Sequence, residues 1–228
     1  MSKTVKKKYA SYEELKENLR VRLVDIRPNR ENVENSIHRN VGCGYALVAY
    51  LRIPGEDGSG IGNLPESLAK KAGREEGEIL RDALFRMEAE EEAHLTPIRE
   101  MVLGPGRDGE VRDVLRTGEN PRDEVLVLTA GDGMFGAAAL FYPGMQEKIG
   151  EIVRDDYYIL PSSVHEVLIV SAGVAQSPRE MAEIVKSINE SQVAPRDRLG
   201  NRVLRYRRGE GTLEVAWDTD RARIWRGR

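Results

Sequence analysis

The sequence predicts an α+β protein in which amphipathic helices pack on a mainly antiparallel sheet. Short apolar, β-prone runs alternate irregularly with segments whose apolar residues recur at helical spacing. The chain shows no sustained series of strand–helix–strand units, which argues against a parallel, doubly wound sheet. At 228 residues it is long enough to bury a core in one large domain.

We interpret residues 11–218 as one α+β domain between two terminal segments. Residues 1–10 are a basic N-terminus that we predict to be disordered, and residues 219–228 are an arginine-rich tail. The segment 104–123 is rich in glycine, proline and charged residues, which predicts a linker or mobile loop. The charged fraction of 32% is slightly high, but it does not depart far enough from globular averages to predict disorder along the whole chain.

The first part of the chain is predicted to contain two helices and a strand. A Ser-x-x-Glu capping box followed by apolar residues at helical spacing predicts a helix over 12–25, which ends before Pro28. Residues 29–39 are interpreted as a second short helix or a turn. The apolar run at 44–53 is predicted to be a buried strand.

Helical periodicity continues between residues 64 and 95, where we predict two helices separated at Gly73. The acidic run at 88–94 is expected to be the exposed end of the second helix. The glycine-rich stretch 55–63 is interpreted as a flexible loop, because it lacks the Lys-Ser or Lys-Thr pair that follows a phosphate-binding loop.

An antiparallel hairpin is predicted for two apolar runs, 124–130 and 135–142, that flank a Gly-Asp-Gly turn. The residues 131–136 also match the spacing G-x-G-x-x-G of dinucleotide-binding loops. That motif requires a helix that starts inside the glycine loop, and here Pro143 follows after only six further residues. We therefore interpret the glycines as a hairpin turn and expect no cofactor.

The last third of the chain has the clearest local signals. A helix is expected after Pro143 and Gly144, and a helix over 178–191 is predicted from a capping box with proline at the first helical position. Two short strands, near 203–207 and 212–217, are expected to pair.

The candidate site lies in the stretch YYILPSSVHEVLIV, residues 157–170, which we interpret as a strand pair or a bent strand. It carries Ser162, Ser163, His165 and Glu166 within five positions. Strand alternation places Ser163 and His165 on one face, and Ser162 and Glu166 on the other. These four residues are the candidate binding residues.

A serine beside a histidine raises the question of a hydrolase. A serine nucleophile needs an aligned base and an oxyanion hole, and the chain contains no G-x-S-x-G elbow. Pro161 indicates instead a bend or sheet edge where the serine hydroxyls satisfy backbone groups. We therefore assign no catalytic residue. We also assign no metal site, because His165 and Glu166 need further ligands and the other histidines are only His38 and His94.

Two segments resemble a bacterial family that is described as a domain of unknown function. They are LPSSVHEVLIV, residues 160–170, and NESQVAPRDRL, residues 189–199. The stretch VLTAGDGMFGAAALFYPGM, residues 127–145, is also similar to the hairpin of that family, although Ala130 stands where the family has asparagine. The resemblance covers roughly residues 10–206. It implies membership, and it implies no activity, cofactor, substrate or catalytic residue.

These observations leave several functions open. The first hypothesis is a non-catalytic binding or protein-interaction module whose surface includes residues 162–166. The alternative is a hydrolase-like enzyme that uses a Ser/His pair in the same segment. A weaker alternative is nucleic-acid binding through residues 196–228, which hold ten arginines and five acidic residues; the overall negative charge argues against it.

The cytoplasm is the expected location. No apolar run approaches the ~20 residues that a membrane-spanning helix needs, and the N-terminus lacks the apolar segment of a signal peptide. We therefore expect no membrane association, and the identity of a protein partner stays open.

Overall fold

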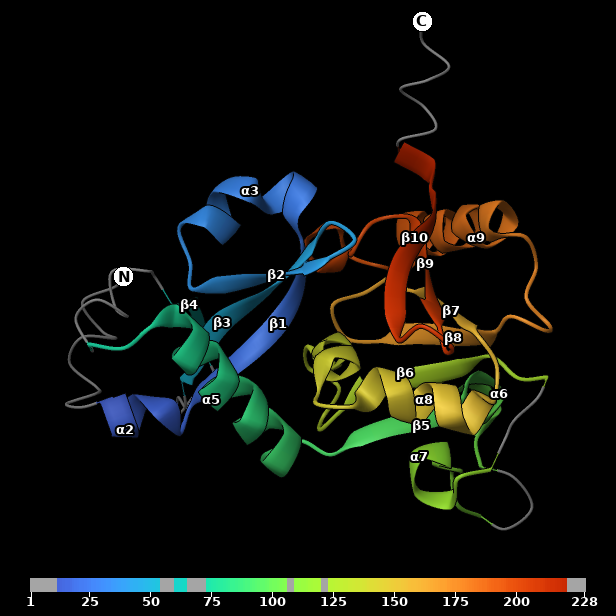
Figure 1. Ribbon diagram of the computed structural model, residues 1–228, viewed down its shortest axis with the longest axis horizontal. Coiled ribbons are helices and arrows are strands. Elements are labelled where there is room, and N and C mark those ends of the chain that lie inside the picture. The colour runs from blue at the N-terminus through green and yellow to red at the C-terminus, as the bar shows by residue number, and fades with distance from the viewer. Residues whose placement is uncertain (1–11, 54–59, 65–72, 106–108, 120–122, 221–228) are drawn as a thin grey trace, which may run out of the picture. The chain divides into compact units, whose positions relative to one another are not determined.

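The computed structural model describes residues 12–53, 60–64, 73–105, 109–119 and 123–220. The fold is α+β with antiparallel sheets, as the sequence predicts. The chain divides into two compact units, Met1–Glu92 and Ala93–Arg228 (Figure 1). One cooperatively folding domain over 11–218 stays a prediction.

The first unit is built on a sheet with the strand order β1-β3-β2, and β4 also pairs with β3. Its described elements are α2 (Tyr12–Lys16), β1 (Leu19–Asp25), α3 (Ile26–Glu34), β2 (His38–Gly42), β3 (Tyr45–Ile53), β4 (Gly60–Asn63) and α5 (Glu76–Glu90). Helix α5 packs against β1, where the Val21 N–H lies 3.1 Å from Met87 Sδ. Apolar side chains are buried between α5 and the sheet, and a second buried cluster packs Val33 of α3 against Val24 of β1 and Val48 of β3.

The helix predicted over 12–25 is wrong after Lys16, because the chain enters β1 at Leu19. Four residues span about one helical turn and also two strand repeats, so Leu19 and Leu23 share a face in either structure. Antiparallel pairing along all of β1 with β3 decides in favour of the strand. Pro28 does not end a helix; it lies in the first turn of α3, where its missing N–H has no cost.

A buried ion pair joins the end of α5 to β1. Arg20 Nε lies 2.7 Å from Glu91 Oε1, and Arg20 Nη2 lies 2.6 Å from Glu90 Oε2. The Arg20 and Glu91 side chains are each only 9% exposed. The prediction that the acidic run 88–94 is simply exposed is therefore wrong for Glu91. The Arg20 guanidinium also neutralises the negative charge of Glu90 and Glu91 at the C-terminus of α5, where the helix dipole disfavours carboxylates.

Replacing Glu91 by alanine should lower the free energy of unfolding by about 2 kcal/mol, because the buried Arg20 then keeps only one carboxylate partner, the more exposed Glu90. Urea denaturation would measure the change. Glu88→Ala removes an exposed carboxylate from the same helix and should cost less than about 0.5 kcal/mol. Equal losses in the two variants would contradict the role assigned to the buried pair.

The second unit is built on a six-stranded antiparallel sheet with the order β10-β9-β7-β8-β6-β5. Its strands are β5 (Ala93–Pro97), β6 (Leu126–Ala130), β7 (Tyr157–Leu160), β8 (Val167–Ser171), β9 (Arg202–Arg207) and β10 (Thr212–Asp218). Its helices are α6 (Ile98–Leu103), α7 (Val114–Thr117), η1 (Gly136–Phe141), α8 (Met145–Val153), α9 (Pro178–Ser191) and η2 (Pro195–Asp197), of which η1 and η2 are 3₁₀ helices.

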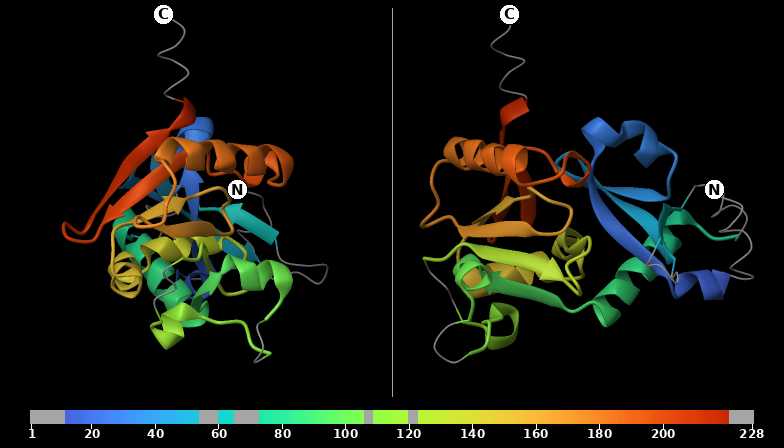
Figure 2. Two further views of the ribbon diagram at one scale, coloured as in Figure 1. Left: turned by 90° about the vertical axis from the view of Figure 1, so that its right-hand side faces the viewer. Right: turned by 180° about the vertical axis from the view of Figure 1, so that it is seen from behind.

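Helices α8 and α9 cover opposite faces of this sheet (Figure 1). The Tyr157 hydroxyl donates to the carbonyl oxygen of Gln146 in α8 at 3.0 Å. Leu160 packs instead in a cluster with Met181 and Val185 of α9. Tyr157 and Leu160 are three residues apart on β7 and so point to opposite faces. Figure 2 shows α9 beside the β9–β10 hairpin from two further directions.

The helix predicted over 178–191 is confirmed as α9, together with its capping box. Ser177 Oγ accepts a hydrogen bond from the Glu180 N–H at 3.3 Å, and the Glu180 carboxylate accepts one from the Ser177 N–H at 3.2 Å. The helix after Gly144 and the β9–β10 pair are also confirmed. In these segments the local pattern and the final contacts agree.

The hairpin predicted from 124–130 and 135–142 is wrong in its second arm. The first run forms β6, but residues 136–141 form η1, and β6 pairs with β5 and β8. Phe135 adopts a left-handed backbone conformation with a φ of 60°, which turns the chain away from the sheet. Strands distant in sequence occupy both edges of β6, and a local turn pattern cannot reveal them.

Part of the segment 104–123, predicted as a linker or mobile loop, is folded. Helix α7 buries Val114, and Asp113 caps it by accepting a hydrogen bond from the Leu115 N–H at 3.0 Å. Two short stretches of this segment lie outside the described residues. The short apolar pair after an aspartate was the available signal for a capped turn.

Other predictions concern residues that the structure does not describe. They are the predicted disorder of residues 1–10, residues 221–228 of the predicted tail, most of the first helix predicted between 64 and 73, and the beginning of the predicted loop 55–63. The second predicted helix of that region is confirmed as α5. None of the described helices is both long and apolar enough to cross a membrane.

Candidate functional site

The four candidate residues lie in the connection between β7 and β8, and neither strand extends into it. The strand alternation predicted for their side chains therefore does not apply. Ser162 and Ser163 are buried, whereas His165 and Glu166 are partly exposed. The structure thus places the two hydroxyl-bearing residues inside the protein and the imidazole at its surface.

The backbone of this connection pairs with the segment 197–199. Val164 donates its N–H to the carbonyl oxygen of Asp197 at 2.8 Å. Leu199 donates its N–H to the carbonyl oxygen of Ser162 at 3.0 Å. A buried backbone requires such partners. The pairing therefore permits the connection to be buried, and it brings Asp197 close to His165.

The Ser163 hydroxyl contacts the backbone. Its Oγ accepts a hydrogen bond from the His165 N–H at 3.1 Å, which is a local serine turn. The expectation that a serine here satisfies a main-chain group is confirmed for Ser163. A nucleophilic serine would instead direct its hydroxyl to the imidazole ring.

The His165 ring is held on two sides. Its Nδ1 accepts a hydrogen bond from the Phe135 N–H at 3.3 Å, and the two rings stack with centroids 5.7 Å apart. Because a backbone N–H can only donate, a neutral ring carries its proton on Nε2. Nε2 lies 3.9 Å from Asp197 Oδ1, and the His165 side chain is 42% exposed. The ring is therefore fixed in orientation, with part of its surface open to a ligand.

Thr129 and Gly136 contact the backbone of His165 and help to fix its position. Thr129 Oγ1 donates to the carbonyl oxygen of His165 at 2.9 Å. A Cβ atom at Gly136 would overlap Thr129 Oγ1 and would lie 2.7 Å from the same carbonyl oxygen. Only glycine permits this close approach. The sequence interpretation assigned Gly136 to a hairpin turn and so missed this role.

Gly136→Ala should lower the free energy of unfolding by about 2 kcal/mol, because the added methyl group overpacks the contact with Thr129 and His165. It should also shift the imidazole NMR signals of His165. Gly209→Ala is the control, since a Cβ there meets no atom within 4 Å. The assignment would fail if Gly136→Ala left both stability and the His165 signals at their wild-type values.

A second imidazole–carboxylate contact was not found from the sequence. His94 Nδ1 lies 2.9 Å from Asp113 Oδ2, and Asp113 Oδ1 accepts hydrogen bonds from the N–H groups of Leu95 and Leu115. The two residues are 19 positions apart in the sequence, so no local motif predicts this contact. Across the described ranges, no group of three His, Cys, Asp or Glu side chains could hold a metal ion.

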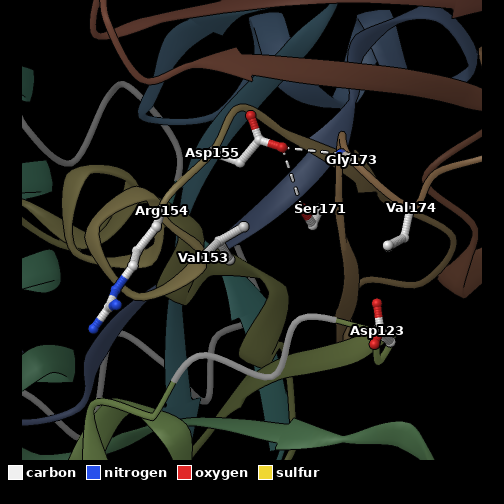
Figure 3. Close-up of a pocket in the computed structure, with 7 residues that line it drawn as sticks. All are labelled: Asp123, Val153, Arg154, Asp155, Ser171, Gly173 and Val174. Carbon is white, nitrogen blue, oxygen red and sulfur yellow. Dashed lines mark hydrogen bonds between the residues drawn. The ribbon is translucent and has the colours of Figure 1, made fainter.

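A pocket of about 320 Å³ lies at the other end of the β7–β8 pair (Figure 3). The residues that line it come from the segment before β6, from the end of α8 and the residues after it, and from the end of β8 and the turn that follows: Asp123, Val153, Arg154, Asp155, Ser171, Gly173 and Val174. Asp155 Oδ2 accepts hydrogen bonds from the Gly173 N–H at 2.9 Å and from Ser171 Oγ at 3.4 Å. None of the four predicted site residues lines this pocket.

The arginines near the C-terminus pair with acidic side chains. Arg205 lies 2.7 Å from Asp156, and Arg207 lies 2.7 Å from Glu214. Arg202 is buried, with its Nε 3.4 Å from a carboxylate oxygen of Asp218. Much of the positive charge in the described part of this region is therefore neutralised within the protein.

Asp156 has a pKa below its usual range. Burial works against ionisation, but the Arg208 N–H donates to Oδ1 at 3.0 Å and the Arg205 guanidinium donates to Oδ2 at 2.7 Å, and these bonds outweigh it. The folded state thus favours the charged form. The associated stability is present above the ordinary pKa of an aspartate and is lost as the pH falls through the lowered value.

Asp156→Asn should reduce the free energy of unfolding by about 1 kcal/mol at pH 7, because two hydrogen bonds to a charge are weakened. The difference from wild type should shrink as the pH falls below the ordinary aspartate pKa of about 3.9 and through the lowered pKa of Asp156, because the wild-type side chain then becomes neutral as well. Urea denaturation across this range would measure it. In an Arg205→Met background the effect should be smaller, and an unchanged difference at low pH would contradict the account.

Comparison with known families matches residues 1–208 to the model of a family described as "Family of unknown function (DUF5688)". The match covers most of the chain, so the chain belongs to this family. No curated protein and no solved structure gives a match. The suspected membership in a family of unknown function is therefore confirmed, and the family description assigns no chemistry to the residues of the site.

Proposed function

We propose that this member of the DUF5688 family is a non-catalytic module that binds a partner protein through the surface around His165. We define the His165 surface as His165, Glu166, Arg196 and Asp197. The supporting observation is that the His165 ring is oriented by the Phe135 N–H and by stacking on the Phe135 ring but remains 42% exposed. We place the protein in the cytoplasm, as the sequence predicts.

Preorganisation supports this proposal. A ring held by a backbone N–H and by stacking loses little conformational freedom when a partner binds. Its Nε2–H can donate to a carbonyl or carboxylate oxygen of the partner. Arg196, whose side chain is 88% exposed, lies 3.6 Å from Asp197 and adds a positive charge to the same surface. Such a mixture of fixed aromatic and charged groups suits protein recognition.

The arrangement of the serines favours binding over hydrolysis. Ser163 and Ser162 are buried, and the Ser163 hydroxyl bonds to the backbone N–H of His165. A hydrolase would need one of these hydroxyls within hydrogen-bond reach of the ring.

The ion pairs of the C-terminal strands argue against the nucleic-acid alternative. The pairing of Arg205 and Arg207 with acidic residues leaves fewer free cations to attract nucleic acid.

A photo-crosslinking amino acid at position 166 should give a discrete adduct with one partner in cells that produce the protein. Adding His165→Ala should reduce the yield severalfold, because it removes the oriented ring. The same crosslinker at Glu183, an exposed position on α9, is the matched control and should give no such adduct. Adducts of equal yield at both positions, or none at 166, would contradict the proposal.

A serine-reactive phosphonate separates the enzyme alternative from this proposal. The wild-type protein should stay unlabelled. Labelling that disappears in Ser162→Ala or Ser163→Ala would instead support the hydrolase-like function.

A further inference from the structure

The pocket in Figure 3 combines two carboxylates with apolar walls. Figure 3 shows the carboxylates of Asp123 and Asp155 on different walls, whereas the Arg154 side chain is directed away from both. Val153 and Val174 supply apolar contact surface. The volume of about 320 Å³ is at the low end for ligand pockets, so it suits a single side chain better than a large cofactor.

The Asp155 carboxylate is fixed by neutral donors. It accepts hydrogen bonds from the N–H of Asp156 at 2.8 Å, from the N–H of Gly173 at 2.9 Å and from Ser171 Oγ at 3.4 Å. Within the described part of the chain it forms no ion pair. Its neighbour Asp156 pairs with Arg205. Two adjacent aspartates thus differ: one charge is neutralised internally, and the other faces a pocket.

The complement of this pocket is a cation on an aliphatic stem. A cation beside Asp155 and Asp123 would gain charge-assisted hydrogen bonds, while the stem would cover the valine side chains. Binding would require little rearrangement, because the Asp155 carboxylate is already held by three donors. A neutral or anionic group would leave the carboxylates uncompensated.

We propose that this pocket receives the basic side chain of an arginine or lysine from the partner protein. That the side chain comes from a protein rests on the proposed function, whereas the cation preference rests on the pocket alone. The His165 surface and this pocket lie at opposite ends of the β7–β8 pair and provide two separate contacts for one partner.

An NMR titration with two isosteric peptides tests the proposal. Acetyl-Gly-Arg-Gly-amide should shift the amide signals of Asp155, Gly173 and Val174 saturably, with a dissociation constant on the order of 1 mM. The same peptide with citrulline, which is neutral, should bind about tenfold more weakly. Asp123→Asn should weaken the arginine peptide several-fold. The variant should fold normally, because Asp123 is exposed.

Three results would overturn the proposal: equal binding of the two peptides, shifts that map outside the pocket, or no saturable shift. A third titration uses agmatine, a free amine, and compares its affinity with that of the arginine peptide. If agmatine binds much more tightly than the peptide, the pocket is a site for small amines and not for a protein side chain. Because this titration needs no partner, its failure is distinguishable from a failure of crosslinking at position 166.

Discussion

The candidate site depends on the backbone pairing between residues 162–164 and residues 197–199. A polar connection between two central strands can be buried only if its N–H and carbonyl groups find partners. Here the hydrogen bonds from Val164 to Asp197 and from Leu199 to Ser162 supply them. The same pairing places the Asp197 carboxylate near His165 Nε2. Without it, the serines would be exposed and the ring would lose its acidic neighbour.

This pairing joins the two segments on which the family resemblance rests. The segment at 160–170 contains the connection, and the segment at 189–199 supplies its backbone partners. Asn189, at the other end of the second segment, donates to the carbonyl oxygen of Gly200 at 2.9 Å and so ties α9 to the chain that leads into β9. The two motif segments therefore form one packing unit.

The parts of the fold that were predicted from the sequence are those whose cause is local. Helix α9 follows from a capping box and an apolar stripe, and both lie within 15 residues. The errors at 12–25 and 135–142 arose where a remote partner decides the structure. Strand β1 needs β3, and β6 needs β5 and β8 on its two edges. Periodicity cannot identify such partners.

The site shows the same division between local and remote causes. The role of Ser163 in a turn was predictable, because that hydrogen bond spans two residues. The contacts of His165 with Phe135 and Asp197 span about 30 positions and were not. These remote contacts restrict the motion of the His165 ring. The ring lies on the connection between β7 and β8, and this strand pair has a neighbouring strand on each side. Such a support would hold the proposed binding surface in a fixed geometry, since neither β7 nor β8 can shift without breaking hydrogen bonds to β9 or β6.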